Sequence, residues 1–184
     1  MKVMDISNWL SEIEGDIEQL KSSGREITDD GNRIFPAPEP NIYNEFISRL
    51  NGIGIGIDAQ IVSLYKECNG IYLTDIYNGY FIWPLEILLM NLNTLGPARI
   101  SAPYNYKILA FGDDGTGQRF ALRTDGSEEI LFLPEGAVEN FTYDAEDKAI
   151  RVISKDFLGF LTRLQADFRA DLSGDSSWVY MTDQ

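Results

Sequence analysis

Hydrophobic and polar positions follow a helical period at the two ends of the chain. Over residues 5–23 apolar side chains recur every three or four positions, and charged residues fall mostly between them. The same spacing returns from residue 155 or 156 to Phe168. A period of about 3.6 residues is typical of amphipathic helices. The sequence therefore predicts a first helix that ends at Gly24 and a closing helix near the C-terminus.

Between these helices the pattern predicts an extended connector and three shorter helices. Prolines alternate over residues 36–40, which disfavours helix and favours extended backbone. Asn41, Asp58 and Pro84 are residue types favoured at helix starts. The predicted short helices cover residues 41–50, 58–68 and 85–92.

The middle of the chain changes to β-branched and aromatic residues. The segment IYLTDIYNGYFIW, residues 71–83, has two such runs on either side of Asn78–Gly79, which predicts a hairpin. Residues 106–124 predict a second hairpin, and residues 128–134 predict a further strand. The segments 140–144 and 148–154 are predicted to pair with each other across an acidic tip.

This order of elements predicts an α+β fold, in which an antiparallel β-sheet meander packs against N-terminal helices and a C-terminal helix. The length fits one domain over residues 1–172, with residues 1–30 as a helical extension. Residues 173–184 are expected to form a polar, loosely held tail, apart from Trp178 and Tyr180.

The turn of the second hairpin, FGDDGTGQRF, raises the question of a ligand-binding loop. Its glycines have the spacing of a phosphate-binding loop, but Gln118 and Arg119 stand where lysine and Ser/Thr are required. An EF-hand is excluded because the later acidic ligands are missing. A weak divalent-ion site at Asp113 and Asp114 stays open as the minor alternative. The favoured interpretation is a wide hairpin turn that displays both acids.

The net charge of the chain indicates which kinds of molecule it can bind. The chain has 29 acidic and 15 basic residues, a formal net charge of −14. This field repels nucleic acid and anionic lipid and attracts a basic protein. Solubility alone is an equally good explanation of the charge taken by itself. No apolar run is long enough to span a membrane, and the N-terminus lacks a secretory pattern. With Cys68 as its single cysteine, the chain is expected in the cytoplasm.

The chain contains no histidine, which disfavours enzyme activity. Neither a Ser–His nor a Cys–His catalytic arrangement can be built, and the commonest zinc ligand is missing. Two converging carboxylates remain a possible catalytic pair, as in glycosidases, with candidates Glu67, Asp75, Glu86, Asp113 and Asp114. Aromatic side chains offer a binding face instead, although core is the default for Trp83; the candidates are Trp9, Tyr72, Tyr77, Tyr80 and Trp83.

Four segments resemble, in this order, the motifs of one family. IDAQIVSLYKECNGIYL resembles its helix that ends at Asn–Gly, and FIWPLEILLMNL resembles its I-x-P-L-x-E-I segment. KILAFGDDGTGQRFALRT resembles its strand turn of Phe and Asp-Gly-Gly, and ISKDFLGFLTRL its closing S-F-x-x-F-L helix. The family is the SUKH superfamily, named in part for a fungal cell-wall-assembly regulator. The resemblance covers roughly residues 30–168, with Ile57–Asp58 in place of the usual leucine-proline.

The resemblance implies a non-enzymatic protein with no cofactor and no catalytic residues. Most bacterial members are immunity proteins that neutralise secreted toxins, often nucleases or deaminases. The expectation is therefore a protein, monomeric or weakly dimeric, that binds a basic toxin domain. The fungal relative suggests the alternative, an intracellular regulatory scaffold linked to cell-wall synthesis. Acidic residues at loop tips are the predicted contacts with the toxin: Asp75, Asp113, Asp114, Asp144, Glu146 and Asp147.

Overall fold

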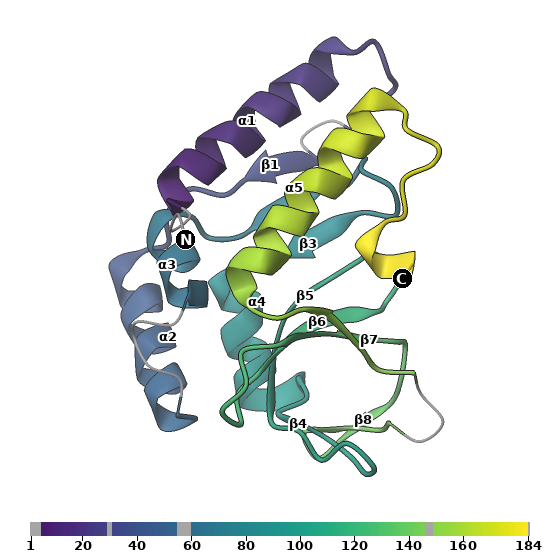
Figure 1. Cartoon of the computed structure of the whole chain (residues 1–184). Helices are drawn as coiled ribbons and strands as arrows, with labels where there is room; N and C mark the ends of the chain where they lie inside the picture. Colours follow the sequence, from purple (N-terminus) through teal and green to yellow (C-terminus); the bar gives the residue numbers. More distant parts are fainter. Residues whose placement is uncertain (1–4, 29–30, 55–59, 146–148, 184) are drawn as a thin grey trace.

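The computed structural model describes residues 5–28, 31–54, 60–145 and 149–183, without the side chains of residues 94 and 95. Within these ranges the chain folds into a large antiparallel sheet with helices on both of its faces (Figure 1). The predicted α+β class is confirmed.

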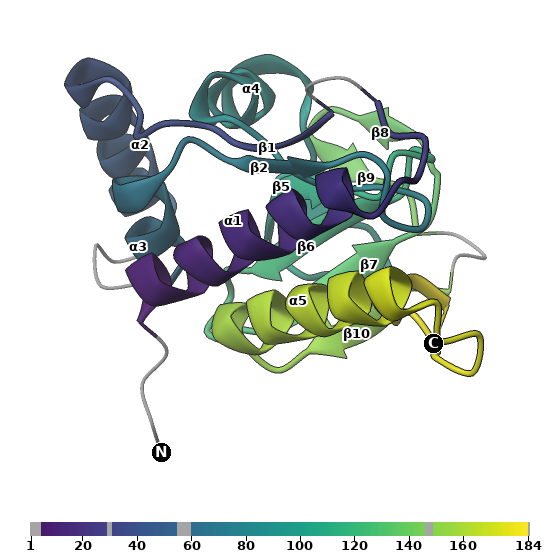
Figure 2. The same ribbon diagram turned by 90° about the horizontal axis from the view of Figure 1, so that it is seen from above.

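The first and last helices lie side by side on one face of the sheet (Figures 1 and 2). Helix α1 spans Ile6–Ser22, and its N-cap Asp5 accepts a hydrogen bond from the Ser7 amide. Helix α5 spans Phe157–Ser173, and its N-cap Asp156 accepts one from the Gly159 amide. Capping residues of this type stabilise the start of a helix, because their side chains accept hydrogen bonds from amides that have no partner within the helix. Both predicted helices are confirmed.

The main sheet has seven strands in the order β1-β2-β3-β5-β6-β7-β10, and each neighbouring pair is antiparallel. The β5–β6 hairpin forms as predicted, with Asp113 opposite Arg119. The strands are β1 (Asn32–Ile34), β2 (Ile71–Leu73), β3 (Tyr80–Ile82), β5 (Ile108–Asp113), β6 (Arg119–Arg123), β7 (Ile130–Leu133) and β10 (Arg151–Ser154).

The β2–β3 hairpin has a longer connection than the predicted Asn78–Gly79 turn. Residues 74–79 join the strands, and both Tyr77 and Gly79 have positive φ, 53° and 98°. Asp75 holds this connection against the segment before β1: its carboxylate accepts hydrogen bonds from the Thr28 amide and the Asn32 side chain. The turn is therefore fixed by a distant segment rather than by the dipeptide alone.

The predicted pairing of residues 140–144 with 148–154 is wrong. Thr142–Tyr143 forms β9 of a small second sheet, between β4 (Arg99–Ile100) and β8 (Val138–Glu139). Strand β10 instead pairs with β7 at the edge of the main sheet. The two segments alternate alike in sequence, but each finds its partner elsewhere, and alternation does not specify a partner.

The remaining helices are α2 (Pro40–Gly52), α3 (Gln60–Glu67) and α4 (Leu85–Met90), which continues into a π-helical turn, η1 (Asn91–Leu95). Helix α3 contacts α1 and α5, and α2 contacts α3 and α4. Asn41 is not a cap, because α2 begins at Pro40, a residue favoured at the first helical position. The predicted cap Asp58 lies outside the described residues.

The core has two parts, one on each face of the main sheet. The larger part joins α1, α3 and α5 to the sheet and includes Phe111, Phe120 and Phe160, each fully buried. The smaller part lies between the sheet, α4 and the small sheet, and includes Trp83 and Tyr143. Burial of Trp83 confirms its core assignment.

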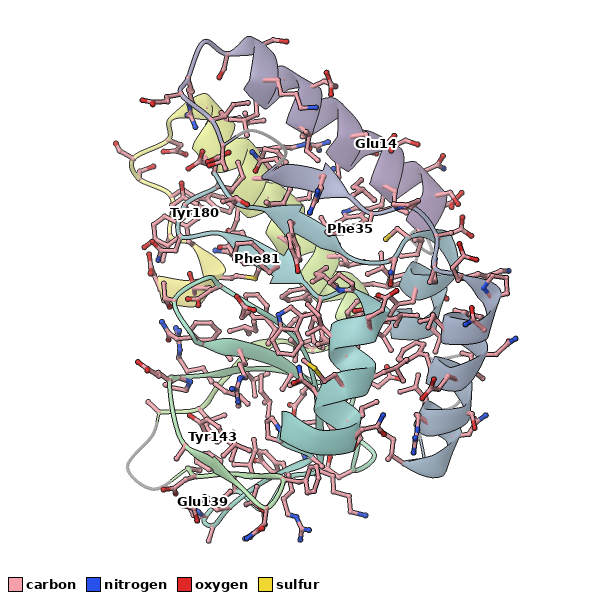
Figure 3. All side chains as sticks on the ribbon, turned by 180° about the vertical axis from the view of Figure 1, so that it is seen from behind. Glu14, Phe35, Phe81, Glu139, Tyr143 and Tyr180 are labelled. Atoms are coloured by element: carbon pink, nitrogen blue, oxygen red, sulfur yellow. The ribbon has the colours of Figure 1, made fainter. Side chains whose placement is uncertain are left out.

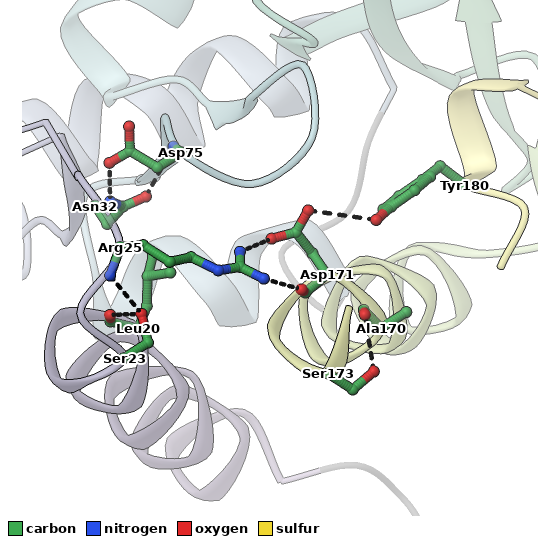
Figure 4. A network of polar contacts seen from close by, with 9 residues as sticks. All are labelled: Leu20, Ser23, Arg25, Asn32, Asp75, Ala170, Asp171, Ser173 and Tyr180. Atoms are coloured by element: carbon green, nitrogen blue, oxygen red, sulfur yellow. Dashed lines mark hydrogen bonds and ion pairs between the residues drawn. The ribbon is translucent and has the colours of Figure 1, made fainter. Parts of the chain in front are cut away.

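The C-terminal tail is anchored beyond the two expected residues, Trp178 and Tyr180, so the expectation of a loosely held tail is wrong for Met181 and Thr182. Met181 and Thr182 are buried in a short 3₁₀ turn, η2 (Met181–Asp183). The indole of Trp178 and the amide of Met181 donate to the buried carboxylate of Asp167, at 2.8 and 3.0 Å. Figure 4 shows Arg25 and Tyr180 meeting at Asp171, which joins the tail to the segment after α1.

Candidate functional site

Partly exposed aromatic side chains lie on the face of the main sheet opposite α1 and α5. On β2 and β3 the side chains of Ile71, Leu73 and Ile82 point into the core, so the alternate residues Tyr72 and Phe81 lie on the opposite face. Phe35, directly after β1, joins them, and all three rings are partly exposed. We call Phe35, Tyr72 and Phe81 the aromatic shelf; Figure 3 shows Phe35 and Phe81 together on this face.

The rings of the aromatic shelf pack edge to face. The centroids of Phe35 and Tyr72 are 4.9 Å apart, and those of Tyr72 and Phe81 are 5.1 Å apart. The guanidinium of Arg33 lies 4.5 Å from the centre of the Phe35 ring. Edge-to-face pairs and a cation over a ring are both favourable. The shelf is therefore ordered before any partner binds.

A hollow of about 320 Å³ adjoins the shelf. Tyr72, Phe81, Trp83 and Ile87 form apolar walls, and Asp113 supplies a carboxylate. One oxygen of Asp113 accepts from the Trp83 indole and the other from the Gly115 amide, at 2.8 Å for the latter. A carboxylate has about four acceptor sites, so Asp113 keeps capacity for another donor.

Charges around the hollow affect its tyrosine. Burial raises the pKa of the Tyr72 hydroxyl above its usual value, and the negative charge of Asp113 adds to this effect, while Arg33 opposes it. Tyr72 is thus a neutral phenol near neutral pH. The hollow offers apolar rings, a phenol and one carboxylate, a combination that suits the stem and head of a cationic side chain.

Asp114 does not share the exposure of its neighbour. It is 1% exposed, and its carboxylate accepts hydrogen bonds from the Thr116 amide, the Thr116 hydroxyl and the Gln118 amide. These bonds close the β5–β6 turn. The expectation that the turn displays both acids is therefore wrong for Asp114, whose carboxylate shapes the turn.

Asp75 is also engaged within the protein. Its two carboxylate oxygens accept from the Thr28 amide at 2.9 Å and the Thr28 hydroxyl at 2.8 Å, besides the bond from Asn32. The Asp75 amide in turn donates to the Asn32 side chain at 3.1 Å. Asp75 is half-buried, and through these hydrogen bonds it connects the β2–β3 connection to β1 and to the segment before it.

The second predicted acidic tip is only partly described. Asp144 is exposed beside the small sheet, where its amide donates to the Ala137 carbonyl at 2.9 Å. Glu146 and Asp147 lie outside the described residues. The structure brings the β2–β3 connection and the β5–β6 turn together, since Gly115 packs against the Asn78 carbonyl and the Phe81 ring. Asp144 lies at the small sheet instead.

Of the predicted aromatic face, only part is at the surface. Tyr80 and Trp9 are buried in the core, and the Tyr80 hydroxyl donates to Asp167 at 2.7 Å. Tyr77 is exposed and stacks on Tyr180, with ring centres 4.0 Å apart. Arg33, Phe35 and Phe81 were not among the predicted binding residues. Strict alternation along 71–73 and 80–82 was the signal that could have placed Phe81 beside Tyr72.

Two kinds of reactive group can be assessed in the described residues, a metal site and a cysteine nucleophile. No group of three His, Cys, Asp or Glu side chains in the described ranges is placed to hold a metal ion. Burial raises the pKa of the Cys68 thiol to about 11. That thiol is protonated near neutral pH and is a poor nucleophile.

Comparisons with known proteins give no relative: no family model matches the chain, and no curated protein matches it significantly. Within the described ranges, no helix has both the length and the apolar character needed to cross a bilayer.

Proposed function

We propose that this chain is a non-enzymatic immunity protein that binds and neutralises a basic toxin domain through the aromatic shelf and the adjoining hollow. The observation that carries the proposal is the position of the Asp113 carboxylate between aromatic walls, with acceptor capacity left over. An arginine or lysine of the partner would enter the hollow and contact both the rings and the carboxylate.

The composition of this surface supports a protein partner. Tyr, Trp and Arg are the residues that most often dominate the energy of protein interfaces, and here Arg33, Tyr72 and Trp83 lie together. A preordered aromatic surface also loses little side-chain entropy on binding. The formal net charge of −14 would accelerate the approach of a basic domain.

The test uses the toxin domain encoded next to this gene, with its affinity measured by calorimetry. Phe81→Ala and Asp113→Asn should each weaken the complex by about tenfold or more, as expected of central interface residues. Phe141→Ala and Glu139→Gln are the controls, because Phe141 is an exposed ring outside the hollow and Glu139 is an exposed acid on the small sheet, where Figure 3 labels it. The controls should change the affinity by less than about threefold.

Unchanged affinity in both Phe81→Ala and Asp113→Asn, with circular dichroism showing that both variants are folded, would refute the proposed binding face. If no neighbouring toxin exists and the protein instead binds envelope-synthesis proteins, the alternative function of a regulatory scaffold in cell-wall synthesis takes its place. The same surface variants would then be tested against those proteins.

A further inference from the structure

A second, larger cleft lies away from the aromatic shelf. It has a volume of about 590 Å³ and lies between the C-terminal end of α2 and the first residues of β4 and β5. Ile53, Leu92 and Ile108 form apolar walls, while Arg99 and Lys107 contribute the charged side chains. Small-molecule sites in proteins usually measure about 300–1,000 Å³ and combine mostly apolar walls with a few polar groups. The cleft has both properties.

The two cations are fixed close together by the backbone. Arg99 and Lys107 form an antiparallel bridge, which places their side chains next to each other on one face. Hydrogen bonds hold the strands on either side: the Ile108 amide donates to the Ala98 carbonyl at 3.0 Å, and the Thr124 amide donates to the Lys107 carbonyl at 2.9 Å. The backbone positions that carry the two cations are therefore fixed relative to each other.

Like charges directly opposite each other on strands are destabilising. Within the described part of the chain, neither Arg99 nor Lys107 forms an ion pair, although acidic residues outnumber basic ones by 29 to 15. Both side chains are exposed to solvent. The pair thus creates a local positive potential that an anion would neutralise.

The surroundings of the pair define the rest of the ligand. An adjoining hollow shares Gly52, Ile53 and Leu92 with the cleft and is lined by Glu45 and Arg49, which face each other at 3.9 Å. Their charges largely cancel, so the net positive charge of the region comes from Arg99 and Lys107. Ile53 is 40% exposed and Leu92 is half-buried, so both offer apolar surface to a ligand beside the buried Ile108.

We propose that this cleft binds a small amphipathic anion, with its carboxylate or phosphate head on Arg99 and Lys107 and its apolar body against Ile53, Leu92 and Ile108. The inference does not rest on the proposed immunity function, because the aromatic shelf and its hollow are lined by other residues than the cleft. It gives an otherwise acidic protein a specific site for a negatively charged molecule.

The experiment is calorimetric titration of the purified protein with octyl phosphate, octanoate and neutral octanol. At least one anion should bind saturably with one molecule per chain, and about tenfold more tightly than octanol, since charged hydrogen bonds add to apolar burial. Phosphate and carboxylate heads are compared in the same titrations, which distinguishes the two kinds of ligand.

The decisive variant is Arg99→Gln combined with Lys107→Gln, which should weaken anion binding by about tenfold or more through loss of both charged donors. The matched control is Lys66→Gln combined with Lys155→Gln, which removes the same charge from exposed lysines that do not line the cleft. Control affinity should equal that of the wild type. The proposal would be overturned if the wild type, the Arg99/Lys107 variant and the control all bound the anions equally. It would also be overturned if octanol bound as tightly as the anions, or if no anion bound saturably.

Discussion

Asp113 and Asp114 are adjacent in sequence and have different environments in the β5–β6 turn. Asp113 is half-buried at the edge of the hollow, while Asp114 is buried under its own turn. One Asp114 oxygen accepts three hydrogen bonds, from the Thr116 amide, the Thr116 hydroxyl and the Gln118 amide. The other oxygen faces the Gln118 side chain at 3.4 Å. Asp114 therefore has a structural role in the turn, whereas Asp113 remains accessible for the proposed binding.

Substitution of Asp114 should expose this structural role. Asp114→Ala removes the acceptor of three close hydrogen bonds and should lower the free energy of unfolding by about 2–4 kcal/mol. Asp114→Asn keeps one acceptor oxygen for the same donors and should cost less than half as much. Urea denaturation measures both. Similar losses for Ala and Asn would show that the charge of Asp114, rather than its acceptor geometry, stabilises the turn.

The distinction between these two acids was beyond sequence reasoning. The glycines and paired acids of the segment predict a turn, and the turn forms. Which of two neighbouring carboxylates folds back over the backbone depends on the exact place where the strand ends. Strand ends are set by pairing with β3 and β6, which is not encoded locally. The candidate site was therefore predicted in part, through Asp113 and Tyr72.

At the scale of the elements, α5 connects β3 to the C-terminal tail. Its Asp167 is fully buried and accepts hydrogen bonds from the Tyr80 hydroxyl, the Trp178 indole and the Met181 amide, besides pairing with Arg163 at 3.1 Å. One helical carboxylate thereby joins β3, the tail and its own helix. A buried charge is tolerated here because every contact around it is a donor.

Trp178→Phe should loosen the tail without unfolding the domain. The substitution keeps a ring but removes the donor to Asp167, and should lower the free energy of unfolding by about 1–2 kcal/mol. Limited proteolysis within residues 175–183 should become faster. Val179→Ala is the control, since Val179 is 53% exposed and its side chain is not needed for the Asp167 contacts. If the two variants are cleaved equally fast, the indole bond does not hold the tail.

The elements themselves were largely predictable, and their partners were not. Residues 6–22 and 157–173 are helical because their apolar spacing and capping residues agree. Residues 142–143 and 151–154 form strands as expected, but they belong to different sheets. Periodicity is a local property, whereas strand pairing is decided by contacts between distant segments, so the main sheet order had to come from the structure.

For the whole molecule, the surplus of acids has two opposite effects. A formal net charge of −14 creates repulsion within the folded chain. The same charge attracts a basic partner over distances comparable with the Debye length, about 10 Å at 0.1 M salt. Added salt should therefore stabilise the free protein and slow its association with a basic partner.

Raising sodium chloride from about 0.02 to 0.3 M should raise the melting temperature of the free protein by a few degrees, because screening reduces self-repulsion. The association rate with the proposed basic toxin should fall by about tenfold or more over the same range. Differential scanning calorimetry and stopped-flow measurements give the two values. Choline chloride should have the same effects if screening is the cause. A melting temperature that falls with both salts would contradict the argument.

The hydrogen bond from Trp83 to Asp113 has a practical consequence. It places an indole in the wall of the hollow, with its N–H on the carboxylate that we assign to binding. Indole emission depends on local polarity and on nearby charge, so the surface contains an optical reporter of its own occupancy. With Trp9 and Trp178 replaced by phenylalanine, the fluorescence of Trp83 would follow a partner's arrival at this hollow in real time, without any attached dye.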